Sequence, residues 1–144
     1  INSMLNYGYT ILRATVARHV MAAGLHPGVP LQHTNAGNAM RLVDDLMEPF
    51  RPLVDLCVQR LNDAGKTALD DHSKRELALL GTRSLQTSRG ISPVSMAVQR
   101  LAVSLAQAYE SPAVYLELPD TNSNALSFLW DSADDPNQDD EEAD

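Results

Sequence analysis

The sequence predicts an all-α protein, a compact bundle of about four to six helices around a buried central helix, with an irregular acidic C-terminal tail. Apolar residues recur at spacings of three and four through most of the 144 residues, which indicates amphipathic helices. Prolines and glycines divide these stretches at intervals typical of short connections. A hydrophobic fraction of 44% suffices for a core in a chain of this length. No apolar run reaches the roughly 20 residues that a membrane span needs.

The first helix is predicted from Ser3 to Ala23, where apolar side chains follow helical spacing and Gly24 then supplies a stop. Residues 25–30 contain two prolines and a glycine, so they form a connector. A second helix begins between Asn35 and Asn38, either of which can cap it, and continues towards Glu48.

Pro49 lacks an N–H and disfavours helical backbone in the residue before it, so the second helix ends or kinks there. A buried third helix follows from Phe50 to about Asn62, and Gly65 marks its end. A short helix from Lys74 to Leu80 comes next.

Residues 82–91 are compatible with an extended or hairpin-like excursion. Ser92 and Pro93 then resemble a cap and a first helical turn, which predicts a last firm helix to about Tyr109.

Charge divides the chain into two parts. Residues 131–144 hold 8 of the 19 acidic residues and no Lys or Arg, so the remaining 11 acids balance the 11 basic residues. We therefore expect a helical domain over residues 1–120 and an irregular to disordered acidic tail over residues 121–144. The single cysteine excludes an internal disulfide and a cysteine-based zinc cluster, and it favours a reducing cytoplasm.

A candidate metal site lies between residues 33 and 52. Asp45 and Glu48 are three residues apart and share a helix face close to His33. Carboxylates crowded at a helix C-terminus need a cation. Arg41 could supply it as an ion pair with Asp44 or Asp45. A divalent ion could supply it instead, and a site of one imidazole with carboxylate oxygens suits Mg²⁺ or Mn²⁺.

Three blocks of sequence resemble a known family. They are residues 1–14 (INSMLNYGYTILRA), residues 22–28 (AAGLHPG), and His33 followed by residues 45–52 (DLMEPFRP). Their order and spacing resemble CRISPR-associated protein one, the metal-dependent DNA endonuclease and integrase of spacer acquisition. The spacing from the histidine to the final carboxylate is most similar to the form found with type II CRISPR systems.

The resemblance implies that His33 and Glu48 are catalytic metal ligands for Mg²⁺ or Mn²⁺ and that Asp45 is a supporting catalytic carboxylate. It implies prespacer and repeat DNA as substrates, a homodimer in the full-length protein, and CRISPR-associated protein two as adaptation partner. The family has a further glutamate ligand on a preceding helix and an N-terminal β-rich domain. This chain starts too late to contain them, so we expect the chain alone to be inactive.

Arg51, Arg41, Tyr7 and Asn6 are the candidate DNA-binding residues, although an ion pair within the helix is the favoured role for Arg41. The rival interpretation is a non-catalytic helical interaction module with an acidic partner-binding tail. Convergence of His33 and Glu48 to within about 5 Å would distinguish the two, because each metal–ligand bond is roughly 2 Å long.

Overall fold

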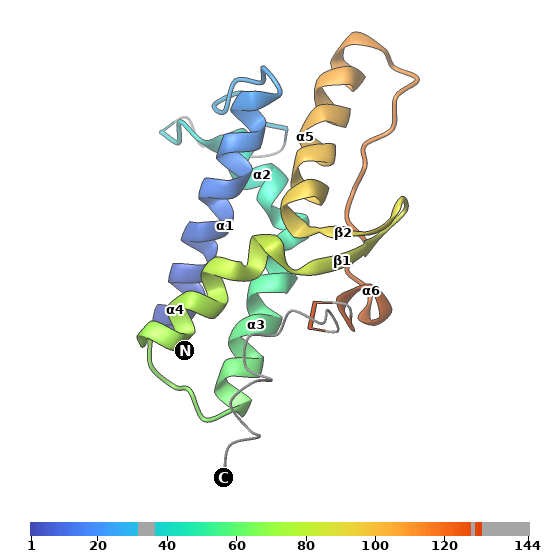
Figure 1. Ribbon diagram of the computed structural model, residues 1–144. Coiled ribbons are helices and arrows are strands. Elements are labelled where there is room, and N and C mark those ends of the chain that lie inside the picture. Colours follow the sequence, from blue (N-terminus) through green and yellow to red (C-terminus); the bar gives the residue numbers. More distant parts are fainter. Residues whose placement is uncertain (32–36, 128, 131–144) are drawn as a thin grey trace.

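A computed structural model describes residues 1–31, 37–127, 129 and 130 (Figure 1). It confirms the all-α class, with one small β-hairpin added. The helices are α1 (Asn2–Ala22), α2 (Arg41–Met47), α3 (Arg51–Asp63), α4 (Asp71–Ala78), α5 (Val94–Glu110) and α6 (Ser123–Ser127). Two short 3₁₀ turns, η1 (Glu48–Phe50) and η2 (Leu79–Thr82), and the strands β1 (Ser84–Thr87) and β2 (Gly90–Pro93) complete the set. Of the predicted acidic tail, residues 121–144, residues 128 and 131–144 lie outside the described residues.

Helix α1 contacts α2, α3, α4 and α5, so most of the core is built on it (Figure 1). Its buried face carries Leu12, Val16 and Val20, which recur at helical spacing as predicted. The helix gives way to Gly24, whose positive φ of 77° an L side chain rarely adopts. The stop predicted at this glycine is therefore confirmed.

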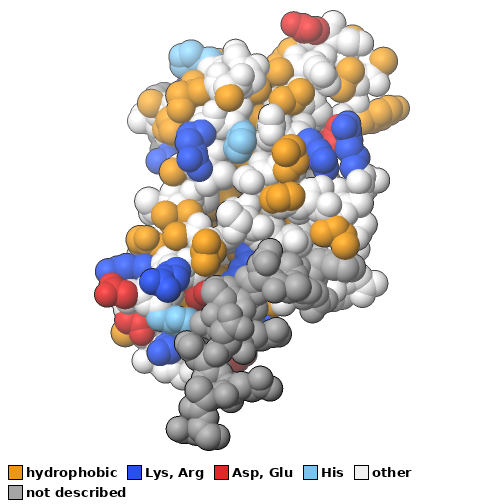
Figure 2. All heavy atoms as spheres, viewed as in Figure 1, with side chains coloured by type: hydrophobic (Ala, Val, Ile, Leu, Met, Phe, Trp, Pro, Cys, Tyr) orange, Lys and Arg blue, Asp and Glu red, His pale blue; other side chains and the backbone are white. Residues whose placement is uncertain are grey.

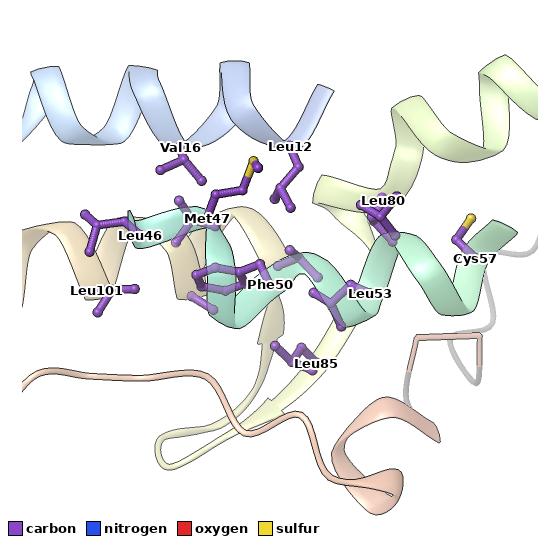
Figure 3. Packing of buried hydrophobic residues seen from close by; sticks show 14 of the residues in the cluster. Leu12, Val16, Leu46, Met47, Phe50, Leu53, Cys57, Leu80, Leu85 and Leu101 are labelled. Atoms are coloured by element: carbon purple, nitrogen blue, oxygen red, sulfur yellow. The ribbon is translucent and has the colours of Figure 1, made fainter. Parts of the chain in front are cut away.

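The kink predicted at Pro49 is present. Helix α2 ends at Met47, η1 makes a single 3₁₀ turn, and α3 resumes at Arg51. Phe50 lies in this turn with no exposed surface. Figure 3 shows its ring among core side chains such as Leu46 and Leu53. The turn therefore fastens both helices to the core directly beside Glu48.

The start of α2 differs from the prediction. The helix begins at Arg41, because the side-chain oxygen of Asn38 already accepts the backbone N–H of Met40 at 2.9 Å in the preceding turn. The alternative cap, Asn35, lies outside the described residues.

The start of α5 was also predicted wrongly. Pro93 is the last residue of β2, where it pairs with Ser84 of the antiparallel partner strand, so the helix begins at Val94. Because β2 pairs with β1, β2 continues to Pro93, which was expected in the first turn of the helix.

After α5 the chain returns alongside that helix (Figure 1). The backbone N–H of Glu117 donates to Ser104 Oγ at 2.9 Å, which holds this return segment, residues 111–118, on α5. Helix α6 then packs on β1, with Ala125 and Leu129 buried. The predicted division at residue 120 stays a prediction, but packed residues continue beyond it.

Gly8 of α1 faces side chains of α3 and α4 at short range. A Cβ at this position would lie 2.5 Å from Cγ1 of Val54 and 3.2 Å from Cδ2 of Leu77. Gly8→Ala is therefore expected to destabilise the fold by about 1–3 kcal/mol in urea unfolding, because the added methyl overpacks the core. Combining it with Val54→Ala should give less than the sum of the two losses, since the clashing methyl is gone. If the two losses are additive, the destabilisation by Gly8→Ala does not come from the contact with Val54.

Candidate metal centre

A cleft of about 270 Å³ brings together two of the predicted site residues. Asp45 and Glu48 lie on the same side of α2 and η1, as their spacing predicted, and both line this cleft. The remaining walls are aliphatic and come from the connector, α2, η1, α5 and the return segment: Leu31, Leu46, Pro49, Leu101, Leu116 and Leu118. Carboxylates at the edge of an apolar hollow are less well screened than on an open surface.

Asp45 ties the connector to α2. Its Oδ2 accepts the backbone N–H of Leu31 at 2.7 Å. Two further bonds run between the same segments, from Leu42 N–H to the Pro27 carbonyl at 2.8 Å and from Arg41 Nε to the Gly28 carbonyl at 3.1 Å. The chain is thus held against α2 two residues before His33. His33 itself lies outside the described residues, so its predicted convergence with Glu48 stays a prediction.

Asp44 takes its cation from another helix. Arg13 of α1 donates to both carboxylate oxygens, from Nε at 2.7 Å and from Nη2 at 3.1 Å, and Asn38 Nδ2 donates to Oδ2 at 2.5 Å. The hydrogen bonds to this carboxylate raise the pKa of Arg13. The salt bridge of Asp44 is therefore with Arg13 rather than with the expected Arg41, whose Nε donates to the Gly28 carbonyl.

Glu48 is paired with Arg51. Oε1 lies 2.9 Å from Nε, and the two side chains are 49% and 37% exposed. The Arg51 Nε atom is buried, and no acceptor in the described part of the chain satisfies its N–H in hydrogen-bonding direction. The contact is thus a charge pair without a well-directed hydrogen bond.

The ring of Tyr9 stacks against the Arg51 guanidinium. The guanidinium carbon lies 5.0 Å from the ring centroid, which is cation–π range. The Tyr9 hydroxyl donates to the Asp55 carboxylate, and this bond raises the pKa of Tyr9. The candidate DNA-binding residues Tyr7 and Asn6 also lie on α1, half-buried and exposed respectively, but neither is among the described residues that line the cleft. Tyr9 is connected to the site through Arg51.

The donors around the cleft suit a hard divalent cation, because they are carboxylate oxygens. Among residues 1–31, 37–127, 129 and 130, no group of three or more His, Cys, Asp or Glu side chains is close enough to hold a metal. Asp45 and Glu48 would therefore need a further donor, and His33 is the predicted one. Cys57 is not a candidate, since burial raises the pKa of its thiol to about 11.

A family model described as CRISPR associated protein Cas1 matches residues 1–87, which is more than half of the chain. The matched range includes α2 and η1 together with α1 and α3, the helices they contact. The chain belongs to the Cas1 family. The resemblance of the three sequence blocks is thereby confirmed, while the type II form stays a prediction. No helix of the described residues has the length and apolar character to cross a membrane.

Curated Cas1 relatives match different lengths of this chain. A Cas1 endonuclease of Neisseria meningitidis serogroup C is 44% identical over 66 residues, which cover 46% of this chain and 22% of the relative. A second Cas1 endonuclease of Pyrobaculum aerophilum is 34% identical over 110 residues, covering 75% of this chain and 37% of the relative. The chain therefore spans less than two fifths of the length of either relative.

A solved structure is similar to this chain in three dimensions. A casposase bound to integration product superposes with a TM-score of 0.69 at 27% identity, over 81% of this chain and 37% of that one. The superposed 81% is a larger share than the 87 of 144 residues that the family model matches, so the likeness extends past that match.

Proposed function

We propose that the full-length protein is a divalent-metal-dependent DNA endonuclease and integrase that inserts prespacer DNA into a CRISPR repeat array. The observation that carries this proposal is the placement of Asp45 and Glu48 in one cleft, within the residues that match the Cas1 family. The names of the relatives, endonucleases and an integration-product complex, support the same class of reaction.

In this proposal the 3′-hydroxyl of the prespacer attacks a phosphodiester at the repeat boundary. A P–O bond forms to the prespacer 3′-oxygen, and the P–O bond to the 3′-oxygen at the repeat boundary breaks. The attacking hydroxyl gives up a proton and the leaving oxygen takes one up, which leaves a free 3′-hydroxyl. Mg²⁺ or Mn²⁺ held by His33 and Glu48 would supply positive charge beside the phosphate. Asp45 holds the segment that leads to His33 and supports the ligand set from the adjacent turn.

Arg51 is the better DNA-binding candidate of the two arginines. Its guanidinium is partly exposed beside the cleft, and its pairing with Glu48 compensates the carboxylate in the metal-free chain. Once a cation neutralises Glu48, Arg51 becomes available to a phosphate. Arg41 is occupied by the Gly28 carbonyl and serves the connector instead.

The remaining parts of the proposal concern the whole protein. We infer that prespacer and repeat DNA are its substrates, that it dimerises, that it works with CRISPR-associated protein two, and that it acts in the cytoplasm. The matches cover 22% and 37% of the two relatives, and the rest of their length is enough for the further glutamate ligand and the β-rich domain.

One observation favours the rival, a non-catalytic helical interaction module. Glu48 and Arg51 form an i,i+3 ion pair, which is what an ordinary charged helix face also contains. The test is a gel assay of prespacer joining to repeat DNA by the full-length protein in Mn²⁺, with His33→Ala and Glu48→Ala. The proposal expects both variants to lose joining while they remain folded. Joining by both at the unmodified rate would support the rival.

A further inference from the structure

A second cavity, of about 170 Å³, lies where α3 and α4 meet the end of the described chain. It shares no lining residue with the cleft at Asp45 and Glu48. Its lining residues are Cys57, Arg60, Leu61, Ala64, His72, Glu76, Arg83 and Trp130. The function proposed above uses none of them.

The cavity has an excess of positive charge. Arg83 is only 8% exposed, and its Nη2 donates to Glu76 Oε2 at 2.5 Å. That bond is the only side-chain hydrogen bond of Arg83 to the described residues, so a guanidinium with five N–H groups lines the cavity with further donors to spare. Arg60 adds a second full charge and His72 a third nitrogen donor. Glu76 balances only one of the two guanidinium groups.

Trp130 forms the aromatic side of this cavity. The guanidinium carbon of Arg60 lies 4.8 Å from the centroid of its ring, so the arginine is stacked with its edge still able to donate. A site with two arginines, one of them buried, and an aromatic wall is suited to an oxyanion, because paired N–H groups match the two oxygens of a carboxylate.

We propose that this cavity binds a carboxylate of the chain's own acidic segment, residues 131–144. Two observations favour this source. The segment is covalently joined to Trp130, which itself lines the cavity, so its first acidic residues cannot be far from the opening. Eight of its fourteen residues are acidic and none is Lys or Arg, which complements the charge of the cavity. The binding would cover arginines that could otherwise contact a DNA phosphate, and it is independent of the metal site.

Trp130 provides the measurement, because it is the only tryptophan of the chain. A variant that ends at Trp130 should differ in tryptophan emission from the full chain. Adding a peptide of residues 131–144 should reverse the difference with saturation, and the affinity should fall as salt is raised. A peptide with every Asp and Glu replaced by Asn and Gln should have no effect.

Substitutions locate the binding. Arg60→Gln and His72→Gln, each in the shortened chain, should weaken peptide binding, Arg60→Gln by at least about tenfold, because a hydrogen bond to a charged group is lost. Arg75→Gln is the matched control, since Arg75 is exposed on α4 and does not line the cavity. Backbone and side-chain NMR shifts of His72 give a second readout that does not depend on the Arg60–Trp130 stack.

Three results would overturn the proposal. The first is identical Trp130 emission in the full chain and the shortened chain, with no saturable effect of the peptide. The second is peptide binding that Arg60→Gln and Arg75→Gln weaken equally. The third is tighter binding of a DNA oligonucleotide or inorganic phosphate than of the peptide to the shortened chain, which would assign the cavity to phosphate instead.

Discussion

Glu48→Gln is expected to lower strand joining by the full-length protein by about 100-fold or more and to weaken Mn²⁺ binding. Glutamine keeps the size of the side chain and one carbonyl oxygen but loses the negative charge that a divalent ion requires. Glu48 is about half exposed and lies at the cleft, so the substitution buries no new polar group and the fold should persist. Joining is measured on gels, and Mn²⁺ binding is measured by the loss of the free-ion signal in electron paramagnetic resonance.

Arg51→Gln is the informative comparison for this prediction. It leaves the Glu48 carboxylate in place and removes its present counter-charge. Mn²⁺ binding should then become at least as tight as in the unmodified protein, while DNA affinity falls. Glu110→Gln, an exposed position at the end of α5, should change neither quantity. Equal loss of Mn²⁺ binding in the Glu48 and Arg51 variants would mean that the pair holds local structure rather than serving as ligand and counter-ion.

Phe50→Ala is expected to cost about 3–5 kcal/mol of folding free energy, which is a large share of the roughly 5–15 kcal/mol available to a domain. The ring has no exposed surface and lies in the turn that joins α2 to α3, so its loss leaves a cavity between two helices (Figure 3). Urea unfolding followed by circular dichroism measures the change.

Phe50→Leu tests whether the loss of stability comes from the cavity that Phe50→Ala leaves. Leucine refills much of the space, so this variant should retain more than half of the lost stability. A loss below about 1 kcal/mol for Phe50→Ala would contradict the prediction and mean that neighbouring side chains fill the space left by the ring. Because Phe50 is two residues from Glu48, the destabilised variant should also bind Mn²⁺ more weakly in the full-length protein.

The elements with a strong local pattern were predicted well. Helical spacing and the glycines at 24 and 65 located α1 and α3, and Pro49 located the break between α2 and α3. These signals act within one or two turns of the chain, and the sequence contains them directly. The same is true of Asp45 and Glu48, whose shared face follows from a spacing of three.

The partners of the charged residues could not be read from spacing. Asp44 had a suitable arginine three residues away, yet its partner is Arg13, 31 residues earlier. Tyr9 and Asp55, 46 residues apart, meet because α1 packs against α3. Such pairs depend on how two helices rotate against each other, and helical periodicity determines only which face is apolar.

One face of the molecule carries charged side chains of both signs. Lys, Arg, Asp and Glu side chains intermingle on the face seen in Figure 2, with hydrophobic groups scattered between them. This agrees with the balance of 11 acids and 11 basic residues outside residues 131–144. A face of mixed charge gives weak long-range attraction to DNA, so DNA binding would depend on individual residues such as Arg51.

The hydrogen bond from Leu31 to Asp45 also restricts the backbone two residues before His33. Asn38 is held through Asp44, so the chain is anchored to α2 at both Leu31 and Asn38. The ordering cost of a short tethered loop is small compared with that of a free one, since much of it is already met when the core folds. Loss of the Asp45 carboxylate would therefore remove the anchor at Leu31, even if Asp45 never touched a metal. Effective concentration, as well as ligand identity, thus links Asp45 to the proposed site.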